Sequence, residues 1–449
     1  MTHGQSQSIA SPIPRDPKQK FWDPEIQTMS RDRIRALQED GLRELVQKAF
    51  DHPAPFFQRK LKSAGIASAR DIRTVDDLNL IPLTVKQELR ESEAEFPVYG
   101  GYRFTDPREA VRLGTSTGST GNPTVSIWTK HDLWWEYESA CRFLWRAGVR
   151  PGMTVVHAHP GYLYGGGLML SGSLEYFGCQ NVWVPPPETD AIAHRALDFL
   201  VKLNPDRSFV IFSHGRFMEA AQSFGIPKDD KRLAFFQRVP GDGLRTSFDM
   251  EDGGIPLRTA GLDCYVWMGE RCGHSPGAHL HEDRAIVQAV DPATGKEVPH
   301  GEWGTLVVTT LGRDNGMIRY DLEEACKLLV EPCSCGETTI RGIWGGRLSD
   351  LMMIQGKRLH SHQFEQALRS VPDVSHPGVE FQIVRSAEAD GPLKIRIERG
   401  LNSVASDDEI TKTCRTHLKQ ALGVEMDVTI LPRETLPRSG YKAARVVRE

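Results

Sequence analysis

Short apolar runs alternate with helical patterns along much of this chain, and this alternation restricts the fold to layered α/β architectures. Runs suited to buried strands cover 153–157, 181–184 and 209–212. Amphipathic or apolar helical patterns cover 132–147, 168–177 and 191–201. Strands and helices in such order predict a sheet covered by helices.

The pattern changes after residue 346, which predicts a second domain. Two helices are expected at 361–368 and 407–422, and three strands at 381–384, 393–398 and 426–431. About a hundred residues suffice for an independent α+β unit. We therefore expect a mobile polar tail with three prolines at 1–20, a large layered α/β domain at 21–345 and a small mobile lid at 346–449.

Hydroxyl and glycine side chains fill the loop at 115–124, which reads TSTGSTGNPT. Glycines permit close backbone approach, and hydroxyl and N–H groups donate to anions, so the loop is suited to phosphate. Expected strands at 110–113 and 125–128 would make it the tip of a hairpin. Asn122 and Pro123 stand where a Walker loop needs Lys and Ser or Thr, which excludes that motif. A flexible polar linker is the alternative interpretation.

A second segment near the C-terminus, LPRSGYKAARVV at 436–447, accompanies this loop. Together they resemble the two signature segments of adenylate-forming enzymes, the acyl-CoA synthetase and luciferase superfamily. The stretch GRLSDLMMI at 346–354 is similar to the hinge of that superfamily. Three segments in the same order are much more specific than any one of them.

Other segments are similar to phenylacetate–coenzyme A ligases within that superfamily. They are FWDPEIQTMS at 21–30, GAHLHED at 277–283 and PCSCG at 332–336. The resemblance covers the chain from about residue 21 to its end. It implies activation of a carboxylic acid with ATP and Mg²⁺ to an acyl-adenylate, followed by transfer of the acyl group to CoA.

The resemblance assigns roles in binding ATP to residues far apart in the sequence. Lys442 matches the catalytic lysine of the adenylate-forming step. The loop residues Ser116, Thr117, Gly118, Ser119, Thr120 and Gly121 would hold the β- and γ-phosphates. Gly241 and Asp242 would lie against adenine, and Arg347 would contact phosphate or ribose. At the position of the family's ribose-binding Asp this chain has Glu324, so either Glu324 or Asp321 would bind the ribose hydroxyls. At the hinge position, usually Asp or Lys, it has Ser349.

The resemblance also points to a magnesium ligand and an acyl pocket. Glu270 corresponds to the acidic residue that binds Mg²⁺. Residues predicted to line the pocket are Tyr162, Tyr164, Gly165, Gly166 and Trp267. Glycines leave room for a flat ring but could equally serve a tight turn. Trp267 in place of glycine would fill part of the pocket, so the acid need not be phenylacetate.

Eight cysteines in a cytoplasmic protein predict a metal site rather than a disulfide framework. Cys272, His279, Cys333 and Cys335 form a Cys3His set of the kind that structural Zn²⁺ prefers. Some phenylacetate–coenzyme A ligases have the same arrangement. His274 or His281 could replace His279 as the nitrogen ligand.

Composition agrees with a metabolic enzyme. The net charge of −4 does not indicate a surface that binds nucleic acid. No leader or membrane-spanning segment is recognisable in the sequence, so we expect a cytoplasmic protein. We predict an ATP-dependent CoA ligase for an aromatic or arylacetic acid, with a homodimer expected from the family. The alternatives are an adenylating enzyme that passes the acyl group to an amine or carrier protein, and an inactive zinc-stabilised binding homologue.

Overall fold

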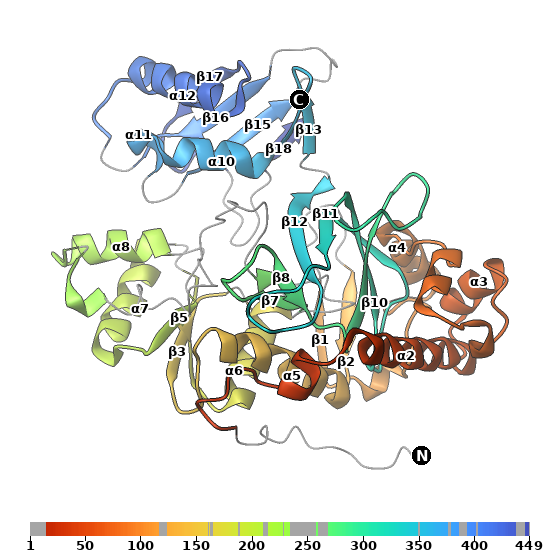
Figure 1. Cartoon of the computed structure of the whole chain (residues 1–449). Coiled ribbons are helices and arrows are strands. Elements are labelled where there is room, and N and C mark those ends of the chain that lie inside the picture. The colour runs from red at the N-terminus through yellow and green to blue at the C-terminus, as the bar shows by residue number, and fades with distance from the viewer. Residues whose placement is uncertain are drawn as a thin grey trace.

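The computed structural model describes most of the chain. The described residues are 15–115, 124–159, 161, 165–186, 189–209, 214–227, 229–233, 257–258, 268–348, 351–375, 379–385, 393–400, 403–436 and 445–448. Figure 1 shows a large N-terminal part and a smaller C-terminal part above it. Among the described helices, none combines the length and the apolar character that crossing a bilayer requires.

Four helices lead the chain into the large part: α1 (Pro24–Gln27), α2 (Arg31–Asp51), α3 (Pro55–Ser63) and α4 (Lys86–Glu95). Short 3-10 turns lie at Ala69–Asp71, Val75–Leu80, Pro107–Glu109 and Lys231–Leu233. Helix α2 buries Leu42, Leu45, Val46 and Ala49 on one side. That spacing gives it one apolar face toward the main core.

Strands β1 (Arg112–Thr115) and β2 (Val125–Trp128) form the expected hairpin. They pair antiparallel, and Thr115 lies opposite Val125 at the last pair before the loop. The loop residues 116–123 lie outside the described part of the chain. The strands therefore confirm the hairpin and fix where the loop starts and ends.

A three-stranded parallel sheet follows, in the order β4-β3-β5. Its strands are β3 (Thr154–His157), β4 (Gln180–Trp183) and β5 (Arg207–Phe209), and the helices around it are α5 (Lys130–Arg146), α6 (Gly165–Phe177), α7 (Asp190–Leu203) and α8 (His214–Ser223). Val155 joins the main core with α5 and α6, whereas Val156 joins a smaller core with α7 and α8. Both faces are thus covered, as alternating side chains require.

The alternation of strands and helices does not continue beyond α8 in the described residues. A seven-stranded antiparallel sheet has the order β6-β7-β8-β12-β11-β10-β9. Its strands are β6 (Leu257–Arg258), β7 (Gly269–Arg271), β8 (Ala278–Leu280), β9 (Ala285–Val290), β10 (Trp303–Thr310), β11 (Tyr320–Leu329) and β12 (Arg341–Arg347). Neighbouring strands of this sheet pair antiparallel.

The C-terminal part is the expected α+β unit. Its elements are β13 (Leu351–Ile354), β14 (Lys357–His360), α10 (Ser361–Arg369), α11 (Pro372–Ser375), β15 (Phe381–Arg385), β16 (Lys394–Glu398), α12 (Asp407–Leu422), β17 (Asp427–Leu431) and β18 (Val446–Arg448). The strands β17-β16-β15-β18 form one sheet. Its buried side chains, from Met352 to Val428, form a core of their own. The domain boundary at 345/346 stays a prediction, and this separate core supports it.

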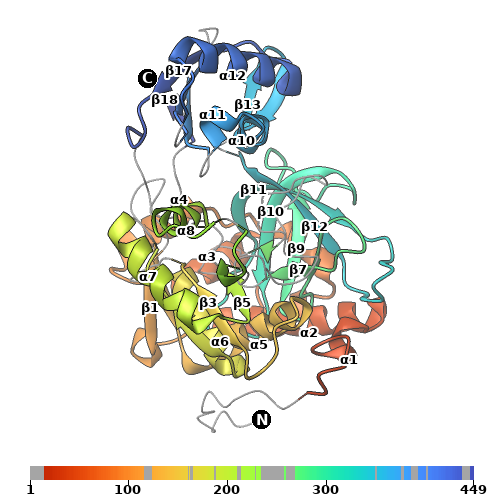
Figure 2. The ribbon, with the colours of Figure 1, turned by 90° about the vertical axis from the view of Figure 1, so that its left-hand side faces the viewer.

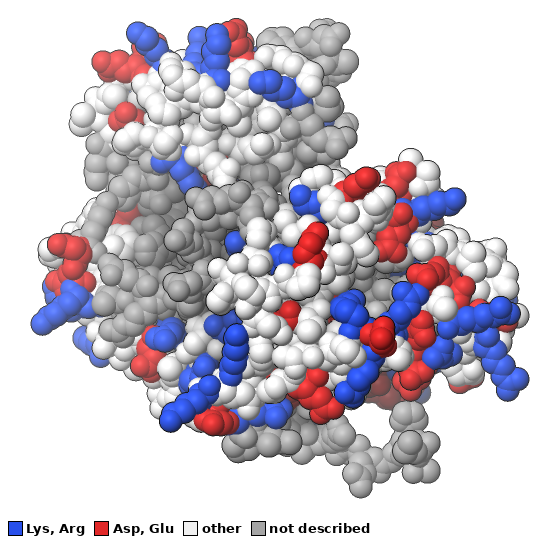
Figure 3. All heavy atoms as spheres, viewed as in Figure 1, with Lys and Arg blue, Asp and Glu red and all other residues white. Residues whose placement is uncertain are grey.

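Figure 2 shows the same two parts from a second side, again with the C-terminal part above the helices α7 and α8. On the face in Figure 3, acidic and basic side chains are interspersed over the described surface. Among the described residues, Arg59 forms an ion pair with Glu95 and Arg35 with Asp76. The described surface on this face therefore presents no broad patch of one sign.

Candidate functional site

The base of the hydroxyl–glycine loop is held by side chains from outside the hairpin. Glu93 of α4 accepts hydrogen bonds from the Val125 amide at 3.2 Å and from the Tyr102 hydroxyl at 2.7 Å. Arg103 donates to the Val125 carbonyl oxygen and lies over the ring of Tyr102. These contacts fix the exit of the loop. The predicted phosphate contacts, Ser116 to Gly121, lie outside the described residues and stay predictions.

Glu324 and Arg347 occupy directly opposite positions on β11 and β12. They form the first pair of this ladder, next to an irregularity between Ala325 and Cys326. Because opposite side chains lie on the same face of a sheet, the predicted ribose carboxylate and the predicted phosphate or ribose arginine share one face. The structure thus brings together two residues that the sequence assigned to the same ligand.

Asp321, the alternative candidate for the ribose contact, stabilises the backbone of β11 through hydrogen bonds. Its Oδ1 accepts hydrogen bonds from Thr305 Oγ1 at 2.5 Å and from the Glu323 amide at 2.8 Å. The side chain is buried, and Glu323 has a positive φ of 54°. Asp321 therefore stabilises an unusual turn of the backbone, and that leaves Glu324 as the better candidate for the ribose.

The passage from β12 into the C-terminal part is tightly packed. Gly346 has a φ of +85°, and a Cβ at this position would overlap the imidazole of His360. His360 Nε2 lies 3.2 Å from the carbonyl oxygen of Arg347. Ser349, the predicted hinge residue, lies outside the described residues. The contact between His360 and the end of β12 nevertheless shows that β14 packs against this passage.

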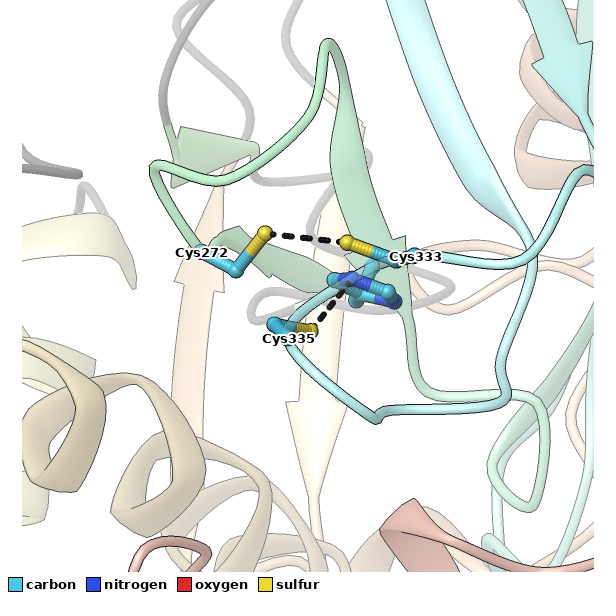
Figure 4. Close-up of side chains that lie close together, drawn as sticks. Cys272, Cys333 and Cys335 are labelled. Carbon is cyan, nitrogen blue, oxygen red and sulfur yellow. Dashed lines mark hydrogen bonds between the residues drawn. The ribbon is translucent and has the colours of Figure 1, made fainter.

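Cys272, His279, Cys333 and Cys335 converge on one point, as Figure 4 shows for the labelled cysteines. Their ligand atoms all lie within 4.8 Å of one another. Cys272 Sγ is 3.5 Å from Cys333 Sγ, and Cys335 Sγ is 3.3 Å from His279 Nε2. Ligands at tetrahedral Zn–S distances of about 2.3 Å would lie roughly 3.8 Å apart, so the set fits a zinc ion.

The protein surroundings orient these four ligands. His279 Nδ1 lies 3.2 Å from the carbonyl oxygen of Thr339 and donates to it, which leaves Nε2 facing the cysteines. Backbone amides of His274 and Glu337 donate to the sulfurs of Cys272 and Cys335, each at 3.4 Å. His274 contributes its backbone amide, and His279 is the histidine whose ring lies with the three cysteine sulfurs.

The electrostatics of the cluster favour a thiolate at Cys272 and a proton on His279. Hydrogen bonding from Cys335 lowers the pKa of Cys272 far below its ordinary value, although burial opposes the change. Burial alone would lower the pKa of His279, but its hydrogen bond to Cys272 and the charge of Glu337 raise it to about 9. A thiolate beside a protonated imidazole is the arrangement from which a metal ion displaces protons.

Glu270 lies two residues before Cys272, and its carboxylate is engaged by other side chains. Oε2 is 2.5 Å from His281 Nε2, and Oε1 is 3.6 Å from Nε of Arg146. Burial alone would raise the pKa of Glu270, but the fields of His281 and Arg146 lower it well below its ordinary value. The role of Glu270 as a magnesium ligand stays a prediction.

Two residues of this network were not predicted from the sequence. Arg146 of α5 also pairs with Glu337, which follows the Cys-x-Cys turn. Burial and the charge of Glu270 raise the pKa of Glu337 to about 7. Arg146 thereby links α5, β7 and the turn that carries Cys333 and Cys335. The only sequence signal was the position of Glu337 two residues after a predicted ligand.

Of the remaining predicted site residues, the structure describes two and leaves six outside the described part of the chain. Gly165 and Gly166 are buried in the first turn of α6. The others lie outside the described residues and stay predictions: Tyr162, Tyr164, Gly241, Asp242, Trp267 and Lys442. Residues on both sides of Lys442 are described: the Leu436 amide donates to Glu398, and the Arg445 guanidinium donates to Glu380.

The chain is similar to known proteins over nearly its whole length. Residues 356–449 match the family model of the AMP-binding enzyme C-terminal domain. The phenylacetate-coenzyme A ligase of Thermus thermophilus is 31% identical over 95% of this chain and 99% of its own length.

Solved structures of 2-hydroxyisobutyryl-CoA ligase share the fold at 21% identity. The structure in the postadenylation state with 2-HIB-AMP gives a TM-score of 0.83 and covers 99% of this chain and 95% of that chain. The same enzyme with 2-HIB-AMP and CoA in its thioesterification state gives 0.64 over 97% and 95%. The arrangement of this chain is thus closer to the first of these two structures.

Proposed function

This chain belongs to the phenylacetate–coenzyme A ligase family of adenylate-forming enzymes, and from that membership we propose that its substrate is an aromatic or arylacetic carboxylic acid. It is an AMP-forming acid–thiol ligase that uses ATP and CoA. The aromatic character of the acid is supported by relatives named for phenylacetate and by the glycines Gly165 and Gly166 at the start of α6.

The reaction has two steps that balance without a further reactant. A carboxylate oxygen of the acid attacks the α-phosphorus of ATP, and pyrophosphate leaves. The thiol sulfur of CoA then attacks the carbonyl carbon of the acyl-adenylate, its proton is lost to solvent or a base, and AMP leaves. Negative charge grows on phosphate oxygens in the first step, so cationic side chains and amide donors lower its barrier.

The single observation that carries the nucleotide assignment is the pairing of Glu324 with Arg347. An acceptor for ribose hydroxyls and a cation for phosphate or ribose lie side by side next to the start of the C-terminal part. A carboxylate accepts two hydroxyl hydrogen bonds, and a guanidinium donates to anionic oxygens. We assign Glu324 to the ribose and Arg347 to the nucleotide on that basis, with Lys442 as the catalytic lysine.

The Cys3His cluster is proposed to hold a structural Zn²⁺. Four protein ligands would leave no open position for substrate, so the ion would tie β7, β8 and the 333–335 turn together rather than take part in the reaction. Magnesium is expected to accompany ATP. A homodimer and a cytoplasmic location stay predictions.

We propose that the arrangement of the two parts corresponds to the state in which the adenylate has just formed. The higher TM-score with the postadenylation structure of 2-hydroxyisobutyryl-CoA ligase supports this. The C-terminal part would then have to rotate before CoA attacks.

The testing experiment measures pyrophosphate release from ATP and Mg²⁺ over a panel of aryl and arylacetic acids, with and without CoA. Acid-dependent release that turns over only with CoA supports the proposal and identifies the acid. Turnover without CoA supports adenylate transfer to another acceptor, and no release with a broad panel supports an inactive homologue. Lys442→Ala with unchanged turnover would contradict the role of the lysine.

A further inference from the structure

An ion pair joins the C-terminal part to helix α8 of the N-terminal part. Arg433 lies two residues after β17, and its two terminal nitrogens contact both carboxylate oxygens of Glu219, at 3.0 and 2.8 Å. The two residues are 214 positions apart in the sequence. A bidentate pair of this kind fixes the relative orientation of its partners as well as their distance.

Both members of the pair are anchored in rigid surroundings. Glu219 stands on α8 between Phe217, Ala220 and Ala221, which are buried in the core shared with α7. On the other side, Glu398 of β16 accepts hydrogen bonds from the amides of Glu434 and Leu436, at 2.9 and 2.7 Å. The pair therefore connects one folded unit to another and does not join two mobile loops.

The segment that carries Lys442 starts directly after this anchor. Its first flank ends at Leu436, held by Glu398, and its second flank begins at Arg445, whose guanidinium contacts Glu380 at 2.9 Å. Both Glu398 and Glu380 belong to the C-terminal part. The orientation of that part therefore determines where the lysine segment can reach.

We propose that Glu219 and Arg433 are positioning residues that hold the C-terminal part in the orientation for adenylate formation and must separate before CoA attacks. This inference rests on the proposed function. Figures 1 and 2 both show α8 on the side of the N-terminal part that faces the C-terminal part. The pair acts on the lysine through the backbone and does not itself touch substrate.

The exposure of the pair suits a contact that forms and breaks in each cycle. The Arg433 side chain is 26% exposed and that of Glu219 is 11% exposed. A fully buried pair would be costly to separate, and a fully exposed pair would contribute little. An intermediate pair also responds to ionic strength, because salt screens partly exposed charges.

The test separates the two half-reactions in Glu219→Gln. The first is acid-dependent exchange of pyrophosphate into ATP, and the second is a single turnover of preformed acyl-adenylate with CoA. We expect exchange to slow by about three- to tenfold, the effect of losing one sheltered ion pair, while the thioester step is unchanged or faster. The matched control Glu425→Gln removes an ion pair with Lys419 inside the C-terminal part and leaves both rates unchanged.

Exchanging the charges of Glu219 and Arg433 distinguishes a positioning role of the pair from a nonspecific loss of stability. The double variant Glu219→Arg with Arg433→Glu recovers most of the exchange rate if the pair acts by holding the two parts together. Equal slowing of both half-reactions in Glu219→Gln, or no change in either, overturns the inference. Absence of exchange in the unmodified protein with every acid would instead contradict the proposed function.

Hydrogen exchange of backbone amides gives a readout that needs no substrate. In Glu219→Gln, amides of α8 and of residues 427–436 lose protection together, and the charge-exchanged variant regains it. Unchanged protection in Glu219→Gln would show that the pair does not couple the two parts, and would overturn the inference whatever the activity.

Discussion

Glu324 of β11 lies directly opposite Arg347 of β12, in the pair of the ladder nearest the C-terminal part. Asp321, three residues earlier on β11, is instead engaged with Thr305 and the Glu323 amide. Two nearby carboxylates on one strand thus have different tasks. One stabilises the backbone, and the other lies opposite the arginine that we propose binds the nucleotide.

This division predicts opposite results for two isosteric substitutions. Glu324→Gln should raise KM for ATP by about tenfold, as expected for a lost hydrogen bond to a charged acceptor, with little change in the melting temperature. Asp321→Asn should lower the free energy of unfolding by about 1–2 kcal/mol with a smaller effect on KM. Steady-state kinetics at saturating acid and thermal denaturation of both variants check this. A larger increase in KM for ATP in Asp321→Asn than in Glu324→Gln would show that Asp321, and not Glu324, binds the ribose.

The five helices expected from the sequence correspond to α5, α6, α7, α10 and α12, whereas α2, α3, α4 and α8 were not predicted. The helix expected at 407–422 is α12, because Ser406 and Glu409 form a capping box at its start and Gly423 adopts a left-handed conformation at its end. Those signals lie within a few residues of the helix they delimit. The strands 381–384 and 393–398 were equally clear from their apolar patterns.

Long-range relationships could not be predicted in the same way. The pair of Arg146 with Glu337 joins residues 191 positions apart, and no local pattern marks either of them as a partner. The choice of His279 over His274 likewise needed geometry, since three histidines lie within eight residues. The nucleotide residues were found only by resemblance, which specifies positions but not their neighbours.

Replacing glycine by alanine should destabilise the protein more at Gly346, where β12 leads into the C-terminal part, than at Gly356. Gly346→Ala introduces a Cβ that overlaps the ring of His360 and also strains a backbone with φ of +85°. Gly356→Ala has a similar φ of +76° but no atom within 4 Å, so it reports the strain alone. We expect Gly356→Ala to lower the unfolding free energy by about 1 kcal/mol and Gly346→Ala by about 2–4 kcal/mol.

Chemical denaturation of both variants measures this difference. Combining Gly346→Ala with His360→Ala should recover part of the extra cost, since the overlap is removed while the strain remains. Equal destabilisation by the two glycine substitutions would show that His360 moves aside freely.

The Cys3His cluster predicts linked losses of metal and stability. Cys333→Ser should reduce the zinc content well below one equivalent and lower the unfolding free energy by about 3–5 kcal/mol, because metal binding contributes to folding. Cys179→Ser, which alters a partly buried cysteine outside the cluster, should retain its zinc. Elemental analysis and thermal denaturation, with and without a chelator, measure both quantities. A metal-free protein of undiminished stability would refute the zinc site.

His157 predicts a loss of stability in mild acid. The ring is fully buried and stacks on Trp183 with ring centroids 5.2 Å apart. Burial lowers its pKa from 6.5 to about 3. Between these values the unfolded chain binds a proton that the folded chain does not, so stability falls as pH decreases from 6.5 toward 3. The loss attributable to His157 should be about 2 kcal/mol between pH 6.5 and 4.5.

In His157→Phe, which keeps the stacking, the unfolding free energy should decline less over this range. The control His300→Gln, which changes an exposed histidine, should follow the unmodified protein. Denaturant titrations at both pH values measure the difference, and parallel declines in His157→Phe and the unmodified protein would show that His157 takes up its proton while folded.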